Sequence, residues 1–175
     1  MADEVLGEGR FLRLVRRDGW ERVERPGVRG IVVIVAVTPA GELLLVEQYR
    51  PPVDGRVIEL PAGLVGDEEA HRDEPLEAAA QRELREETGW DATAFERLSA
   101  GPPSAGLSTE VITLLRAVDP RRTGDGGGVG SEQIRVHAIP LDQVPSWLAA
   151  READGLLVDP KVWAGLWFAR QAAKR

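Results

Sequence analysis

The run LEAAAQRELREET, residues 76–88, constrains the fold more than any other stretch of the chain. Ala, Leu, Glu and Arg dominate it, so it has the strongest helix propensity in the sequence. Pro75 suits the start of a helix and Gly89 suits its C-terminal stop. On such a helix Glu83 and Glu87 lie one turn apart on the apolar side. The sequence therefore predicts a helix that directs two carboxylates towards the protein interior.

Two carboxylates in this position require an explanation, because neighbouring anions repel each other and resist burial. A divalent cation would resolve the conflict, since Mg²⁺ and Mn²⁺ prefer carboxylate oxygens as ligands. Glu86 flanks the same face and is a third candidate ligand. The alternative is a solvated helix on which these glutamates pair with Arg82 and Arg85.

The remaining pattern predicts an α+β fold. Residues 31–37 and 42–50 are apolar runs joined by a Pro-Ala-Gly turn, so we expect two strands that pair as a hairpin. The Gly-rich residues 122–131 lack the order of a phosphate-binding P-loop, and we interpret them as a mobile excursion. Further strands are predicted at 57–65, 111–118 and 134–141, and further helices at 142–153 and 158–175. Strands and helices do not alternate as βαβ units, which argues against a doubly wound sheet.

The composition excludes several classes of function. The chain has 175 residues and a formal net charge of -7 at pH 7, whereas binding to a nucleic-acid backbone needs a basic surface. It has no Cys, which excludes disulfides and Cys-ligated zinc and fits a cytoplasmic protein. No apolar run approaches the roughly 18 residues of a membrane span. The acidic N-terminus lacks the apolar segment of a signal peptide.

Histidine and tryptophan add little to the functional hypothesis. His71 and His137 do not stand at a metal-ligand spacing with another histidine, so zinc is not expected. Trp147, Trp163 and Trp167 stand at helical spacing among apolar residues. We interpret these tryptophans as core and packing residues.

The helix and the strand before it resemble the signature of the Nudix hydrolases, G-x5-E-x7-R-E-U-x-E-E-x-G-U, where U is a bulky apolar residue. RELREETGW at residues 82–90 matches the second half without a gap, and Gly63 follows a predicted strand as the first glycine does. The spacing between Gly63 and the first acid is longer here. Glu74 matches that acid by its distance from the helix and Glu69 by its distance from Gly63, so both stay open.

The resemblance implies the Nudix fold, in which mixed β-sheets are sandwiched between helices. Glu83 and Glu87 would bind Mg²⁺ or Mn²⁺, with Glu86 as a further ligand. The carbonyl of Ala62 would add another ligand. Arg82 would orient a glutamate of the signature rather than touch the substrate.

Outside the signature the chain is similar to the ADP-ribose and nucleoside diphosphate sugar pyrophosphatases. QYRPPV, ELPAGLV and SEQIRVHAIPLDQV carry this similarity. It implies hydrolysis of a pyrophosphate bond, with ADP-ribose preferred and AMP and ribose 5-phosphate as products. Ala105 replaces a proline that marks ADP-ribose preference. GDP-mannose or another nucleotide sugar, a dinucleoside polyphosphate and an oxidised nucleotide therefore stay open as substrates, as does a nucleotide sensor without catalysis.

By the same similarity, four residues are candidates for binding the substrate: Arg50, Trp20, Glu59 and Gly106. Arg50 follows a strand and could fork onto a phosphate, or it could pack over Tyr49. Trp20 matches an aromatic residue that stacks on the base, or it is a cross-strand residue of a hairpin.

Two loop residues are candidates for the general base. Glu132 follows the Gly-rich loop, where relatives carry a mobile acid with this role. Glu110 is the other candidate for the general base.

Residues 10–25 alternate apolar and polar around Asp18-Gly19, which predicts a β-hairpin. This hairpin resembles the small lobe that the pyrophosphatase branch exchanges between subunits. We therefore expect an N-terminal lobe of residues 1–27, a hydrolase domain of residues 28–175, and a homodimer.

Overall fold

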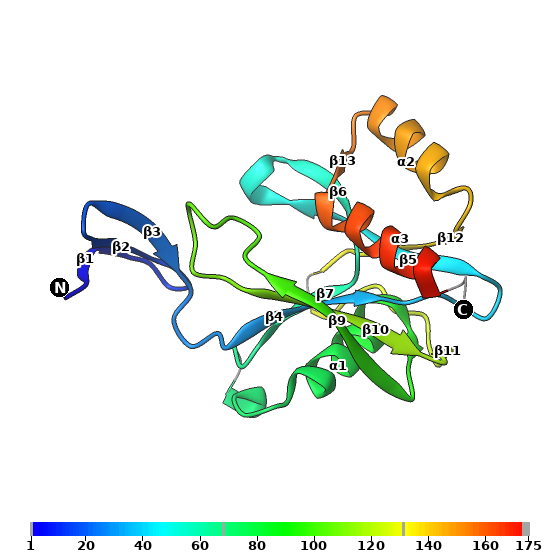
Figure 1. The fold of residues 1–175 in the computed structure, drawn as a ribbon, viewed down its shortest axis with the longest axis horizontal. Helices are drawn as coiled ribbons and strands as arrows, with labels where there is room; N and C mark the ends of the chain where they lie inside the picture. Colours follow the sequence, from blue (N-terminus) through cyan, green and yellow to red (C-terminus); the bar gives the residue numbers. More distant parts are fainter. Residues whose placement is uncertain (1, 68, 131, 173–175) are drawn as a thin grey trace.

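Figure 1 shows the fold as a computed structural model, which describes residues 2–67, 69–130 and 132–172. The strands are β1 (Glu4–Glu8), β2 (Arg13–Arg17), β3 (Trp20–Glu24), β4 (Gly30–Val35), β5 (Glu42–Arg50), β6 (Gly55–Glu59), β7 (Ala62–Val65), β8 (Trp90–Asp91), β9 (Ala94–Gly101), β10 (Ile112–Val118), β11 (Arg121–Arg122), β12 (Arg135–Pro140) and β13 (Leu157–Val158). The helices are α1 (Leu76–Thr88), α2 (Val144–Ala153) and α3 (Pro160–Ala172), with 3-10 turns η1 (Pro51–Val53) and η2 (Glu69–His71). Residues 173–175 of the predicted last helix and Ser131 of the Gly-rich loop lie outside the described residues.

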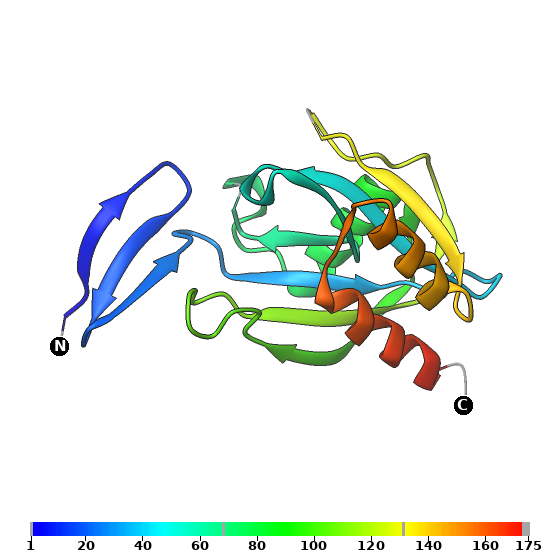
Figure 2. The ribbon, with the colours of Figure 1, turned by 90° about the horizontal axis from the view of Figure 1, so that it is seen from above.

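Two four-stranded sheets form the body of the molecule. Their strand orders are β7-β4-β10-β9 and β12-β5-β6-β13. The β4–β10 and β6–β13 pairs are parallel, whereas β4–β7 and β5–β6 are antiparallel. Helix α1 lies on one side of the first sheet and α3 on the other (Figures 1 and 2). Mixed sheets covered by helices confirm the predicted α+β class.

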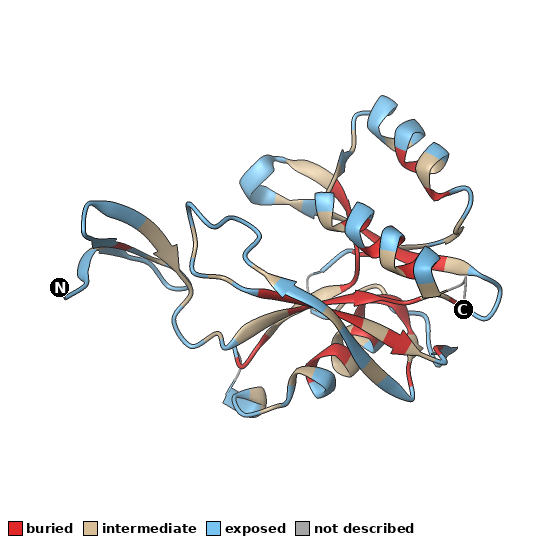
Figure 3. Cartoon of the chain, in the orientation of Figure 1, coloured by how far each residue is buried: buried red, intermediate tan, exposed pale blue. Residues whose placement is uncertain are grey.

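Strand β4 is buried on both faces, which explains its uninterrupted apolar sequence. Val32 and Ile34 pack in the core beneath α1. Val33 and Val35 point the opposite way and pack in the core shared with α2 and α3. One strand thus supports both helical layers, and the buried residues concentrate along it (Figure 3).

The predicted hairpin between residues 31–37 and 42–50 is wrong. The two strands meet only at an isolated bridge between Val37 and Leu43 and then diverge into different sheets. Strand β4 pairs with β10 and β7, while β5 pairs with β12 and β6. Each strand is apolar on both faces, so each lies in the interior of its own sheet.

The predicted strand at 57–65 is two strands, β6 and β7, in different sheets. The break falls at Pro61, which has no N–H group to continue a ladder. The carbonyl of Pro61 accepts a hydrogen bond of 2.8 Å from the N–H of Ile34. At this point the chain crosses from one sheet to the other, directly before Ala62 and Gly63.

Strands β1, β2 and β3 form a separate sheet at the N-terminal end, standing apart from the body in Figures 1 and 2. The predicted hairpin is confirmed as the β2–β3 pair. Asp18 and Gly19, with φ of 52° and 83°, form its left-handed turn. Strand β1 was not predicted. The N–H of Val23 donates to the carbonyl of Leu107 at 2.8 Å, which joins this sheet to the body.

The interpretation of Trp163 and Trp167 as core residues is wrong, because they are 44% and 58% exposed. Helix α3 instead turns Val162 and Leu166 inwards. Trp147 does pack against the core, where its ring lies 4.9 Å from that of His137. Within the described residues, none of the helices is long and apolar enough to cross a membrane.

Candidate active site

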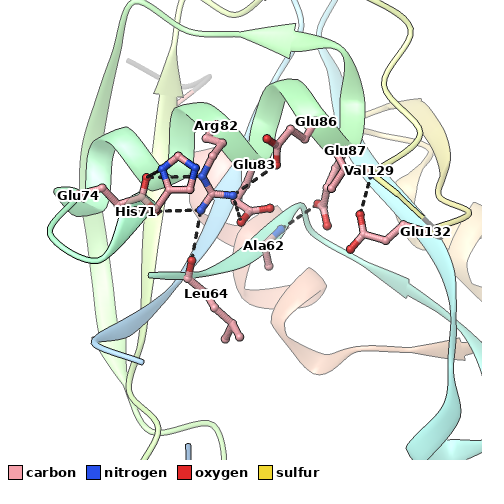
Figure 4. A network of polar contacts seen from close by, with 10 residues as sticks. All are labelled: Ala62, Leu64, His71, Glu74, Arg82, Glu83, Glu86, Glu87, Val129 and Glu132. Carbon is pink, nitrogen blue, oxygen red and sulfur yellow. Dashed lines mark hydrogen bonds and ion pairs between the residues drawn. The ribbon is translucent and has the colours of Figure 1, made fainter. Parts of the chain in front are cut away.

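Helix α1 places Glu83 and Glu87 against the start of β7, as Figure 4 shows. The N–H of Ala62 donates to Glu87 Oε2 at 3.0 Å, and Glu87 is only 5% exposed. A Cβ atom on Gly63 would lie 2.0 Å from the carboxyl group of Glu83. Glycine at position 63 therefore leaves room for the Glu83 carboxylate where it now lies, and a side chain there would require Glu83 to move.

Arg82 holds the surrounding carboxylates in place. Its guanidinium donates to Glu74 at 2.8 Å, to Glu83 at 2.6 Å and to Glu86 at 3.3 Å (Figure 4). It also reaches the carbonyl of Leu64 at 3.4 Å. These contacts accord with the expected role of Arg82 as an orienting residue. They also place Glu74 within the network, although the sequence left the choice between Glu69 and Glu74 open.

Burial and mutual repulsion disfavour ionisation of the central carboxylates. Burial raises the pKa of Glu83 to about 7, with Arg82 opposing and Glu86 and Glu132 reinforcing the shift. Burial also raises the pKa of Glu87 well above its usual value, and repulsion from Glu83 and Glu132 adds to this. The site concentrates negative charge that a cation would stabilise.

The donor chemistry fits Mg²⁺ or Mn²⁺, because carboxylate oxygens predominate. Over residues 2–67, 69–130 and 132–172, however, no three His, Cys, Asp or Glu side chains are gathered closely enough to hold an ion by themselves. Arg82 forms ion pairs with Glu83 and Glu86. Mg²⁺ commonly binds through one or two carboxylates plus water and substrate phosphates, so Glu83 and Glu87 stay candidate ligands.

The two candidate bases occupy different surroundings. Glu132 lies beside the carboxylates of α1 and contributes to the raised pKa of Glu83 and of Glu87. One of its oxygens accepts a hydrogen bond of 2.9 Å from the N–H of Val129. Glu110 instead pairs with Arg25 at 3.2 Å, next to the N-terminal sheet. Of the two candidates, Glu132 is therefore the one that lies beside the carboxylates of α1 (Figure 4).

The Gly-rich loop packs against the end of α1 and is not the free excursion that we expected. The N–H groups of Gly127 and Gly128 donate to the carbonyls of Glu87 and Glu86, both at 2.9 Å. Consecutive glycines gave no indication from sequence that they would bind a helix terminus.

A cavity of about 580 Å³ opens beside Ala62 and Gly63, between the body and the N-terminal sheet. Arg50 and Glu59 line it and pair with each other at 2.7 Å. Tyr49 donates its hydroxyl proton to Asp54, and the Arg50 guanidinium is engaged with Glu59. Arg50 thus lines the cavity and is paired with Glu59, and its role in binding a phosphate stays a prediction.

The other two candidates for substrate binding do not line this cavity. Trp20 is 70% exposed at the tip of the β2–β3 hairpin. Gly106 lies in the loop whose neighbours Ser104 and Leu107 do line the cavity, and a Cβ on it would meet open space. Their roles stay predictions.

Lys161 lines the cavity and was missed from the sequence. It stands in the first turn of α3, where a positive charge opposes the helix dipole. Asp159 compensates, because its carboxylate accepts hydrogen bonds from the backbone N–H of Lys161 and from its ammonium group. An unfavourably placed lysine directly after Asp-Pro was the signal that could have identified it.

Comparisons with known proteins show what this chain is similar to. The model of the NUDIX domain matches residues 28–158. An ADP-ribose pyrophosphatase of Mycobacterium tuberculosis is 35% identical over 159 residues, covering 87% of this chain and 71% of the relative. A GDP-mannose pyrophosphatase of Cronobacter sakazakii is 31% identical over 159 residues, covering 81% of this chain and 80% of the relative. The crystal structure of an ADP compounds hydrolase shares the fold, with a TM-score of 0.73, 19% identity and coverage of 99% and 92%.

Proposed function

We propose a substrate for this chain, which belongs to the NUDIX domain family and is a pyrophosphohydrolase. The substrate is a nucleoside diphosphate sugar, with ADP-ribose preferred. The products would be AMP and ribose 5-phosphate. The observation that carries the proposal is that Glu83 and Glu87 are held against β7, whose residues Ala62 and Gly63 line a cavity of about 580 Å³. Glu83 and Glu87 would anchor a cation next to this cavity, which would hold the nucleotide.

The carboxylates would bind the positively charged metal ion, and Arg50 would bind a negatively charged phosphate. Glu83, Glu86 and Glu87 would hold Mg²⁺ or Mn²⁺, and the carbonyl of Ala62 would assist them. When bound, the ion supplies positive charge against the charge that develops on the two phosphates. Arg50 pairs with Glu59 in the structure and would exchange that partner for a phosphate oxygen.

The proton must leave the attacking water. Water attacks one phosphorus, the bridging P–O bond breaks, and the leaving phosphate keeps the electron pair. Glu132 would take the proton, because it already lies close enough to influence Glu83 and Glu87. Glu110 is the alternative base, but its partner Arg25 would have to release it.

GDP-mannose or a related sugar nucleotide is the second candidate substrate. Ala105 stands where the ADP-ribose branch has proline, and the acidic loop 66–74 before α1 is lengthened. The GDP-mannose pyrophosphatase reported above supports this candidate as well.

The test is a panel of ADP-ribose, GDP-mannose and nucleoside triphosphates with Mg²⁺ or Mn²⁺, with products separated by chromatography. ADP-ribose should have the highest kcat/KM, and a chelator should abolish turnover until metal is restored. A triphosphate preferred by tenfold over every nucleotide sugar would refute the proposed substrate class, since tenfold is about 1.4 kcal/mol of transition-state binding.

We also propose a homodimer in which the N-terminal sheet reaches the partner's site. Phe11, Leu12 and Trp20 of this segment are exposed, as are Leu107 and Val111 of the adjoining body. In a monomer these apolar side chains would face water.

Light scattering at micromolar concentration should therefore show a dimer. Trp20→Ala should raise KM for nucleotide substrates with little change in kcat, because Trp20 would stack on the base in the partner's cavity. A fully active monomer would contradict the dimer. An unchanged KM would assign Trp20 a structural role only.

A further inference from the structure

The last turn of α1 is held by a second segment of the chain, residues 123–128, which we call the glycine clamp. A helix leaves its final carbonyls without partners inside the helix. Here the carbonyl of Glu87 accepts from the N–H of Gly127, and the carbonyl of Glu86 accepts from the N–H of Gly128, each at 2.9 Å. Two of the three glutamates that are candidate metal ligands, Glu86 and Glu87, are thus bonded to the clamp through their backbones.

Gly89, the residue directly after the helix, extends the same contact. Its carbonyl accepts from the N–H of Thr123 at 2.7 Å and from the N–H of Gly124 at 2.9 Å. A Cβ atom on Gly89 would lie 2.3 Å from the carbonyl oxygen of Gly124. Four backbone hydrogen bonds therefore join the clamp to three carbonyls at the helix end, those of Glu86, Glu87 and Gly89.

Gly126 makes this close approach possible. A Cβ atom on it would lie 2.4 Å from the carbonyl carbon of Thr88 and 2.5 Å from the nitrogen of Gly89. Both of those atoms belong to the backbone, so they cannot swing aside. Gly126, Gly127 and Gly128 also have φ of 69°, 105° and 88°, which residues with a side chain rarely adopt.

The other end of the clamp leads to Glu132. The N–H of Ile134 donates to the carbonyl of Gly127 at 3.1 Å, and the N–H of Val129 donates to the Glu132 carboxylate at 2.9 Å. A Cβ atom on Gly128 would lie 2.6 Å from the Cβ of Glu132. The same short segment therefore contacts the backbone of Glu87 and the side chain of Glu132.

We propose that the glycine clamp is a positioning element of the reaction, with Gly126 as the residue that permits it. It fixes the carboxylates at the end of α1 relative to Glu132, and so sets the distance between the metal anchors and the candidate base. This inference rests on the proposed function, since it assigns the clamp a role in that hydrolysis.

Gly126→Ala tests the proposal, with Gly130→Ala as the matched control. Gly130 lies in the same loop with a positive φ of 62°, but a Cβ atom on it meets nothing within 4 Å. The control therefore introduces backbone strain without displacing α1. Gly126→Ala should lower kcat by about tenfold or more, because displacements of an ångström in an active site have effects of this size.

Two further measurements separate positioning from loss of stability. Mn²⁺ binding to the substrate-free protein, followed by electron paramagnetic resonance, should weaken in Gly126→Ala and stay unchanged in Gly130→Ala. The thermal midpoint shows whether both variants are folded at the assay temperature. If Gly126→Ala is folded and retains both kcat and Mn²⁺ affinity, or if Gly130→Ala loses as much of either, the proposal is overturned.

Amide hydrogen exchange of the unmodified protein provides a test that does not depend on whether a variant folds. The N–H groups of Gly127 and Gly128 should exchange about a hundredfold or more slowly than in an unstructured peptide. Exchange at the unstructured rate would rule out the clamp. If no substrate of the panel is cleaved, the proposed function fails, whereas Mn²⁺ affinity and amide exchange still decide whether the clamp positions α1.

Discussion

Helix α1 and the N-terminal sheet differ in what stabilises them. In α1, Ala79, Ala80 and Leu84 are fully buried, and Glu87 is buried with them. Among the residues of strands β1, β2 and β3, all of which the structure describes, Val15 is the only one that is buried. Figure 3 shows the contrast between the exposed sheet and the buried centre.

The charged residues of the two regions reflect this difference. Around α1, the apolar core forces carboxylates into a site that disfavours their ionisation. In the N-terminal sheet, cross-strand ion pairs such as Arg17–Asp3 and Arg16–Glu4 lie at the surface. Exposed pairs of this kind contribute only about 0–1 kcal/mol each. Burial around α1 thus accommodates carboxylates that resist ionisation, whereas the N-terminal sheet has little buried surface and pairs its charges in water.

The largest effect on stability should come from Leu84→Ala, compared with Val15→Ala. Leu84→Ala should lower the free energy of unfolding of the body by about 2–5 kcal/mol, because it leaves a cavity in a closed core. Val15→Ala removes two methyl groups, worth about 1.5 kcal/mol, and should affect only the N-terminal sheet. Urea denaturation combined with amide exchange by segment measures both. If both variants lowered the free energy of unfolding of the body equally, the two regions would unfold as one cooperative unit.

Glu87→Gln should separate stability from activity within the α1 region. It should lower kcat by about a hundredfold or more, which is about 2.7 kcal/mol, because it removes a charge that would anchor the metal. In metal-free buffer the denaturation midpoint should not fall, since the amide avoids burying a negative charge. A loss confined to KM would mean that this helix binds substrate without taking part in catalysis.

The smallest effect should be a local response of the N-terminal sheet to acid. A hydrogen bond from Arg17 is the main cause that lowers the pKa of Asp3 from 3.8 to about 2. A lowered carboxyl pKa contributes stability above the unfolded-state value and loses it as the pH falls. The contribution is therefore complete above pH 3.8 and lost as the pH approaches 2.

Pepsin digestion measures this response, because the protease is active in acid. Cleavage at pH 2 should begin within residues 3–25 and should be slower there at pH 4. At pH 4, the Asp3→Asn variant should be cleaved within residues 3–25 as fast as the unaltered protein is cleaved at pH 2. First cleavage in α1 would show that the N-terminal sheet is the more resistant region.

Local signals in the sequence predicted α1, its end at Gly89 and the turn at Asp18-Gly19. In each case the conformation depends on a few adjacent residues. The partner of β4 could not be predicted in the same way, because β10 lies far along the chain and an apolar run fits any buried position.

The candidate site shows the same limit. The spacing of Glu83 and Glu87 on α1 was readable, but the path of loop 66–74 was not, so Glu69 and Glu74 could not be separated. The contact between Arg82 and Glu74 depends on that path. The lysine after Asp-Pro, Lys161, was visible in the sequence, but its position at the cavity depends on how α3 packs against β4 and β6, which the local sequence does not specify.

The parallel pairing of β4 with β10 has a consequence for synthesis on the ribosome. It joins residues 31–35 to residues 112–116, so β4 emerges long before its neighbour exists. Leu115, which closes the core beneath α1, also arrives after that helix is complete. The growing chain must therefore carry an apolar strand without one of its two neighbours, and the core beneath α1 cannot close until β10 has been made. Pairings between such distant segments form slowly and leave the nascent protein prone to aggregate.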